Sequence, residues 1–94
     1  MTETENADSF FQQAQKLLTA MPPDYATALP LLEQAAEAGH AEAAFQLGGC
    51  MQYGMGTDPN RVQATYWLRK AAEGGHTTAR YNLALLREDN GINI

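Results

Sequence analysis

The chain carries an internal repeat with a period of 36 residues, and this repeat constrains the fold more than any other feature. Segment 28–40 is echoed by segment 64–76, and the two share a first alanine, a leucine, an Ala-Ala-Glu run and a closing glycine and histidine at matching positions. A fixed period of roughly 20 to 50 residues is typical of solenoids, in which each unit buries its apolar face against its neighbours. The sequence therefore predicts a stack of repeated units.

Helical signals fill the chain at the rhythm of this repeat. Cap and stop residues predict five helices, over about 8–19, 24–38, 41–53, 58–73 and 77–89. The expected N-terminal caps are Asp8 or Ser9 for the first helix, Asp58 followed by Pro59 for the fourth, and Thr77 for the fifth. Five helices make two and a half helical hairpins, so the predicted fold class is an all-α superhelix.

Two residues set the local geometry of the second predicted helix. Gly39 suits the left-handed conformation that closes a helix. Pro30 lies inside the helix, where it removes one backbone hydrogen bond and crowds the carbonyl four residues earlier. We therefore expect a kink or a split helix at Pro30.

We predict a single domain over residues 1–94, because a chain this short buries only one marginal core. Within it we expect disorder over 1–7, a divergent first unit over 8–38, a central unit over 41–74, and a C-terminal capping helix and tail over 77–94. The tail is expected to cover the end of the stack or to pack on another copy. Self-association through the ends of the solenoid is therefore one predicted interaction.

Composition excludes several classes of function. The hydrophobic fraction of 45% suits a folded chain, and six basic against eleven acidic residues argue against nucleic acid and anionic lipid as partners. No apolar run reaches the roughly 18 residues of a membrane span. No secretory leader is evident, and the single cysteine excludes an internal disulfide, so we expect a cytoplasmic protein. Residues 1–50 hold seven carboxylates and one lysine, which favours either a solvated surface or a basic partner.

The spacing of small and aromatic residues carries a resemblance. It rests on Ala43-x-Phe45-x-Leu47-Gly48, on Gly54-Met55-Gly56, and on Ala64-x-x-Trp67-Leu68-x-Lys70-Ala71-Ala72-x-x-Gly75-His76. This pattern, over about residues 23–88, resembles the Sel-one-like repeat family, which is related to the tetratricopeptide repeats. Met51 and Thr57 depart from the tyrosine and valine that are usual in that family. The resemblance implies a right-handed α superhelix that acts as an adaptor for protein partners.

The first helix is interpreted as a divergent half-repeat. Ala7, Phe11 and Ala14 stand 36 residues before Ala43, Leu47 and Cys50. This alignment places the first helix in the same register as the third.

Residues that could carry chemistry are better explained as structural. His40 and His76 occupy matching turns and are predicted turn residues, since neither has the neighbouring ligands of a metal site. Cys50 is predicted to be a small core side chain and Trp67 a core anchor. Glu33 and Glu37 are four apart on a helix surface and are predicted to be solvated. We therefore predict no catalytic residue, no metal and no cofactor.

In related helical hairpins the first helix of each unit lines the concave groove, so the resemblance implies that this inner wall is the binding surface. Its predicted partner-binding residues are Gln13, Lys16, Phe45, Gln52, Tyr53, Tyr81, Leu85 and Glu88. Aromatic anchors among amides fit a groove for a peptide or helix. An alternative for Phe45 and Tyr81 is that they fill space between helices. The leading prediction is a non-enzymatic module that binds another protein, and the alternative is a small acidic antidote that covers a basic toxin or effector.

Overall fold

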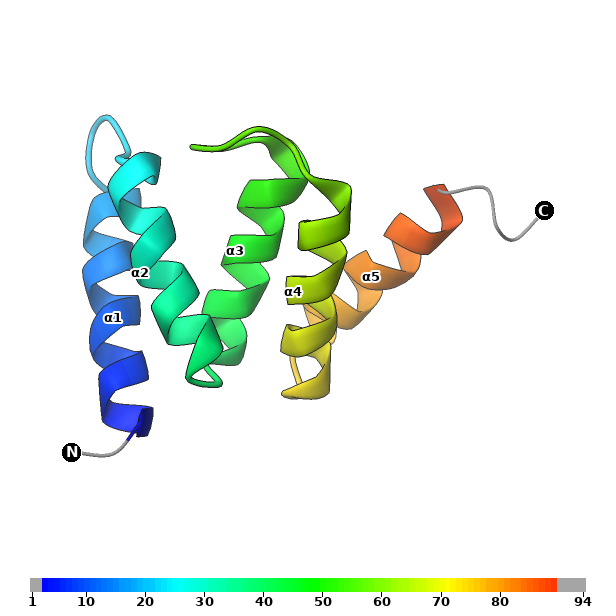
Figure 1. Ribbon diagram of the computed structural model, residues 1–94, viewed down its shortest axis with the longest axis horizontal. Coiled ribbons are helices and arrows are strands. Elements are labelled where there is room, and N and C mark those ends of the chain that lie inside the picture. Colours follow the sequence, from blue (N-terminus) through cyan, green and yellow to red (C-terminus); the bar gives the residue numbers. More distant parts are fainter. Residues whose placement is uncertain (1–2, 90–94) are drawn as a thin grey trace.

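Five α-helices in a row of antiparallel hairpins make up the computed structural model, which describes the backbone of residues 3–89 and the side chains of residues 6–86 (Figure 1). The helices are α1 (Glu3–Leu18), α2 (Tyr25–Glu37), α3 (Ala41–Tyr53), α4 (Arg61–Glu73) and α5 (Thr77–Asp89). Helices α1 and α2 form the first hairpin and α3 and α4 the second, while α5 begins a third. The predicted all-α class is confirmed. The predicted tail falls on residues 90–94, which lie outside the described residues.

Side chains cap the helices, and some caps differ from those predicted. Asp24 accepts a hydrogen bond from the backbone N–H of Thr27 at 3.1 Å, as expected for the start of α2. Helix α4 begins at Arg61 rather than at Pro59, because the Asn60 side chain caps it by accepting from the N–H of Gln63 at 3.0 Å. The predicted cap at Asp58 is therefore wrong.

The two histidines cap the first helix of each following hairpin. Nδ1 of His40 accepts from the N–H of Ala43, and Nδ1 of His76 accepts from the N–H of Ala79, both at 3.1 Å. These bonds confirm that the histidines are structural turn residues. His76 thus takes the capping role that the sequence assigned to Thr77.

Helix α1 begins earlier than the sequence predicts. It starts at Glu3 rather than at Asp8 or Ser9, and the side chain of Ala7 is buried. The expectation of disorder over residues 1–7 is therefore corrected for residues 3–7, which are helical.

Helix α2 runs unbroken through Pro30, so the predicted split does not occur. Pro30 and Ala26 are both exposed, and water can reach the carbonyl that lacks its helical partner. Gly39 has φ +97°, which confirms the left-handed residue predicted after this helix.

The core consists of many alanines around four fully buried leucines, Leu32, Leu47, Leu68 and Leu86. Cys50 and Trp67 are buried, which confirms both predictions. Helices α3 and α4 pack closely at Gly48, where a Cβ atom would lie 2.9 Å from Cγ of Leu68. No larger residue fits at position 48 without displacing α4.

The loop between α3 and α4 packs back on the first hairpin. Gly56 has φ +79°, and a Cβ atom there would lie 2.5 Å from Cβ of Tyr25 on α2. Glycine at 56 therefore meets two requirements, a left-handed conformation and a close approach. The loop bridges neighbouring units as a result.

Equivalent contacts in the two hairpins correct the predicted register of α1. Phe11 stacks on His40 as Phe45 stacks on His76, with ring centroids 4.2 and 4.3 Å apart. The carbonyl of Leu17 accepts from the N–H of Asp24 as that of Met51 accepts from Asn60.

In these pairs each residue of α1 stands 34 residues before its equivalent on α3, whereas equivalent residues of α2 and α4 remain 36 residues apart. The link between the two helices is therefore two residues shorter in the first hairpin. The predicted alignment of Ala7, Phe11 and Ala14 with Ala43, Leu47 and Cys50 is wrong.

Candidate functional site

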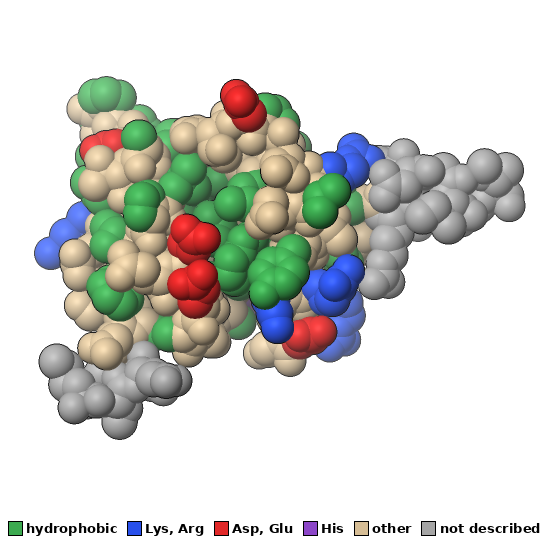
Figure 2. Space-filling model, in the orientation of Figure 1, with side chains coloured by type: hydrophobic (Ala, Val, Ile, Leu, Met, Phe, Trp, Pro, Cys, Tyr) green, Lys and Arg blue, Asp and Glu red, His purple; other side chains and the backbone are tan. Residues whose placement is uncertain are grey.

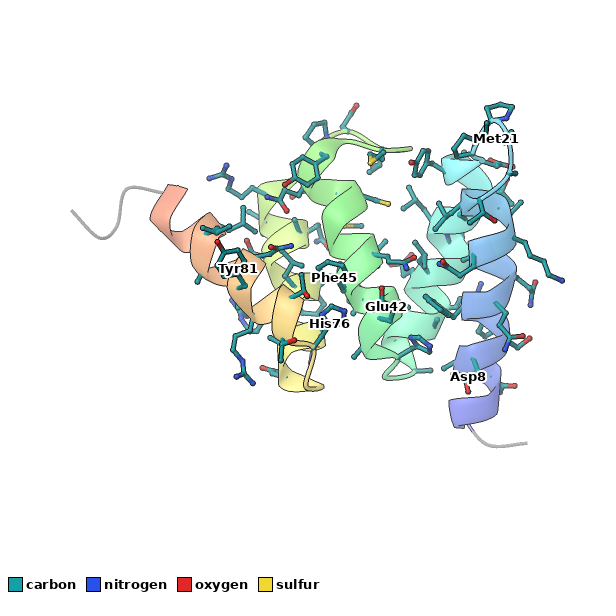
Figure 3. All side chains as sticks on the ribbon, turned by 180° about the vertical axis from the view of Figure 1, so that it is seen from behind. Asp8, Met21, Glu42, Phe45, His76 and Tyr81 are labelled. Carbon is teal, nitrogen blue, oxygen red and sulfur yellow. The ribbon has the colours of Figure 1, made fainter. Side chains whose placement is uncertain are left out.

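The inner wall is the surface that α1, α3 and α5 present on the side of the molecule seen in Figure 3. On α3, one side packs on the first hairpin through buried Leu47, and another meets α4 at Gly48. Helical geometry places Glu42, Gln46, Gly49 and Tyr53 between these two sides. These four residues form the centre of the inner wall.

A chain of side-chain hydrogen bonds crosses this wall between the hairpins. Nε2 of Gln15 donates to Oε1 of Gln46 at 2.6 Å, and Nε2 of Gln46 donates to Oε2 of Glu42 at 3.1 Å. Oε1 of Glu42 lies 2.8 Å from Nε2 of His76. Since Nδ1 of the neutral His76 ring accepts from a backbone N–H, Nε2 carries the proton and donates to Glu42.

Figure 3 shows Glu42, Phe45 and His76 gathered on the middle of the wall, with Tyr81 beyond them on α5. The same arrangement occurs at the first hairpin, where Nε2 of His40 lies 3.4 Å from a carboxylate oxygen of Asp8. The inner wall thus repeats an acidic residue and a stacked ring at each junction.

A cavity of about 330 Å³, which we call the inter-hairpin groove, opens where α1 and α2 meet the end of α3. Its lining residues are Gln15, Leu18, Tyr25, Gln46, Gly49, Cys50, Tyr53 and Met55. Tyr53 is 71% exposed and Met55 is also exposed. Exposed aromatic and thioether side chains beside amides are common features of protein-binding surfaces.

The structure places the predicted α3 and α5 site residues unevenly. Tyr53 lines the inter-hairpin groove, whereas the neighbouring Gln52 is half-buried and does not line it. Phe45 is half-buried against the core and stacked on His76, so the space-filling alternative describes it better. Tyr81 and Leu85 are exposed on α5.

The predicted α1 residues do not join the groove. Gln13 and Lys16 are exposed on the side of α1 opposite Phe11 and Ala14, and the Gln13 amide bonds to Ser9. The error follows from the register of α1, since the equivalents of Gly49 and Gln52 are Gln15 and Leu18. The side chain of Glu88 lies outside the described residues.

Sequence reasoning missed Gln15, Leu18, Gln46, Tyr25 and Met55. Gln46 could have been found, because it lies two helical turns before Tyr53 and therefore on the same face. Tyr25 on α2 and Met55 in the loop after α3 both line the groove because that loop packs on α2 at Gly56. This is a tertiary contact, and no local sequence pattern predicts it.

A second depression lies on the opposite surface, between α2 and α4. This outer groove of about 420 Å³ is lined by Ala36, Glu37, Gly39, Ala41, Ala44, Tyr66, Trp67 and Lys70. Figure 2 shows the apolar strip on this surface, with acidic side chains on one side of it and basic ones on the other. Nζ of Lys70 lies 5.7 Å from the centre of the Tyr66 ring.

Burial raises the pKa of the Cys50 thiol, which keeps it protonated at neutral pH. Within residues 6–86, no three His, Cys, Asp or Glu side chains could together hold a metal ion. Across the part of the chain that the structure describes, every helix is too short or too polar to cross a membrane.

Comparison with known proteins assigns the family. The Sel1 repeat model matches residues 12–40 and 41–76, so the chain belongs to the Sel1 repeat family. An uncharacterized protein of Neisseria meningitidis is 37% identical over 86 residues, which cover 92% of this chain and 18% of that protein.

Two fungal regulators also match. Chitin synthase regulatory factor 4 of Schizosaccharomyces pombe is 42% identical over 70% of this chain and 10% of its own length. Chitin synthase regulator SKT5 of Saccharomyces cerevisiae is 34% identical over 62% of this chain and 8% of its own length. The chain thus spans less than a fifth of the length of each of these three relatives.

Proposed function

We propose that this chain is a non-enzymatic protein-interaction module that binds a partner through the inner wall, at and around the inter-hairpin groove. The observation that carries the proposal is the groove itself. Exposed Tyr53 and Met55 stand beside the amides of Gln15 and Gln46 on a framework fixed by hydrogen bonds between hairpins. Fungal relatives that are named as regulators of another protein support a binding role.

The state of the reactive side chains supports the non-enzymatic part of the proposal. Each histidine uses Nδ1 to cap a helix and directs Nε2 toward a carboxylate, so neither ring has a nitrogen free for proton transfer. The Cys50 thiol is buried and protonated. A single thiol in this state suits a reducing cytoplasmic setting.

The test is capture of partners from the native host with the purified chain, followed by mass spectrometry. Tyr53→Ala combined with Met55→Ala should abolish capture of the specific partner while helix content is retained, because the exposed anchors are lost. Val62→Ala, at a 77% exposed site on α4, is the matched control and should capture normally. Undiminished capture by the double variant would refute the inner wall as the binding surface.

A second candidate is an acidic antidote that covers a basic toxin or effector. The observation that favours it is the charge of the first hairpin, on which Glu33 and Glu37 are exposed along α2 and Glu37 lines the outer groove. Figure 2 shows acidic side chains beside the apolar strip on this surface. Reversal of both charges to lysine should then abolish capture, whereas the Tyr53 and Met55 variant should not. The two variants therefore distinguish the two surfaces.

A further inference from the structure

Each first helix carries an amide side chain at the same place on the inner wall. The correspondence of α1 with α3 pairs Gln12 with Gln46, and the 36-residue period pairs Gln46 with Asn82. We call Gln12, Gln46 and Asn82 the amide ladder. Its three members come from different units, so the ladder runs across the stack rather than along one helix.

The ladder retains unused hydrogen-bonding capacity. Gln46 uses one N–H and one oxygen lone pair, on Glu42 and Gln15, which leaves one N–H and one lone pair. Gln12 is exposed and Asn82 half-buried, and neither amide bonds to another group in the described part of the chain. A primary amide can accept from a peptide N–H and donate to a peptide C=O at once.

We propose that the amide ladder binds the main chain of an extended segment of the partner that carries lysine or arginine. This inference rests on the proposed function and names its partner chemistry. The amides stand on α1, α3 and α5, and an extended chain advances about 3.3 Å per residue, so one extended segment that crosses the wall can present its peptide groups to successive amides.

Charge on the wall selects basic side chains. Asp8 and Glu42 stand one turn before Gln12 and Gln46, and their side chains are 57% and 44% exposed. Nδ1 of each histidine partner accepts a backbone N–H, so the ring that faces each carboxylate is not a cation that would offset it. Among the described side chains that helical geometry places on this face, none is lysine or arginine. A basic segment is therefore complementary to the ladder's surroundings.

The inter-hairpin groove adds selection for one apolar side chain. Gln46 belongs both to the ladder and to the lining of the groove, next to Tyr53 and Leu18. A main chain held at Gln46 would direct a neighbouring side chain into this cavity of about 330 Å³. The expected segment is thus extended and basic, with an apolar residue near its middle.

The experiment uses a phage-displayed library of random peptides long enough to cross α1, α3 and α5 in extended form, selected on the purified full chain. Selected peptides are synthesised with a fluorescent label, and Kd is measured by anisotropy. We expect enrichment of lysine and arginine. Gln12→Met and Asn82→Leu should each weaken binding about 3- to 10-fold, the loss expected for one hydrogen bond. Gln13→Met, at the next residue but on the other side of α1, is the matched control and should leave Kd unchanged.

Main-chain recognition has its own readout. Methylation of one peptide nitrogen removes one N–H donor, and its cost should fall in the variant that lacks the facing amide, as a double-mutant cycle reports. Equal Kd values for the Gln12 and Gln13 variants, or selected peptides without basic residues, would overturn the proposal. Failure to select any peptide would also overturn it. The partner-capture experiment with Tyr53 and Met55 would still decide the proposed function by itself.

Discussion

Neighbouring glycines in α3 should respond in opposite directions to the same substitution. A Cβ atom on Gly49 would meet nothing within 4 Å, whereas one on Gly48 would lie 2.9 Å from Leu68 Cγ and 3.2 Å from the Ala64 carbonyl oxygen. Alanine raises helix stability by about 1 kcal/mol over glycine at either site. At position 48 this gain is opposed by overpacking, which costs about 1 to 3 kcal/mol.

The expected result is that Gly49→Ala stabilises the chain by about 0.5 to 1 kcal/mol, whereas Gly48→Ala loses that gain to overpacking and destabilises the chain by up to about 2 kcal/mol. For a domain of this size each kcal/mol moves Tm by about 4 to 8 °C. Thermal melting followed by far-ultraviolet circular dichroism measures both changes, and each variant is the control for the other. If Gly48→Ala melts at or above the temperature of Gly49→Ala, the close packing of α3 on α4 is refuted.

Three further changes test the core, the buried thiol and the histidine cap. Leu68→Ala should cost about 2 to 5 kcal/mol in urea unfolding, while Val62→Ala on the exposed side of α4 should stay within about 0.5 kcal/mol; equal losses would contradict the burial of Leu68. Because burial raises the pKa of Cys50, its stabilising contribution is complete below the ordinary thiol pKa of about 8.5 and is lost as pH rises through the folded value. Cys50→Ala should therefore flatten the alkaline decline in unfolding free energy, and an unchanged decline would count against this. His76→Ala should cost about 1 to 2.5 kcal/mol through its cap and its stacking on Phe45, and His76→Asn should recover the cap alone; no difference between them would argue against the Nδ1 bond.

The repeat alone was sufficient to predict most of the fold. Glycine and proline positions defined the second and third helices, and the matching turns identified His40 and His76 as structural. The register of α1 could not be predicted, because its link to α2 is two residues shorter than the link in the next hairpin. Such a change falls in an irregular segment, where no periodic pattern records it.

The lining of the inter-hairpin groove was predicted in part for a related reason. Tyr53 follows from the geometry of α3 alone, and its prediction needed no neighbour. The sequence-based prediction named Gln13 and Lys16 instead of Gln15 and Leu18, because the wrong register rotated α1 by about half a turn. Met55 depends on the close approach at Gly56, which only the packed structure defines.

The repeated glycine and histidine pair links helix initiation to the stacking of units. Gly39 ends one helix in a left-handed conformation, and His40 then caps the next helix through Nδ1. The same ring stacks on Phe11 and directs Nε2 toward Asp8 of the preceding unit. Because one side chain serves both purposes, a unit that starts correctly is also placed correctly on its neighbour. The carboxylates that position these rings lie on the inner wall, so the contacts that align the stack also give its proposed binding surface a negative charge.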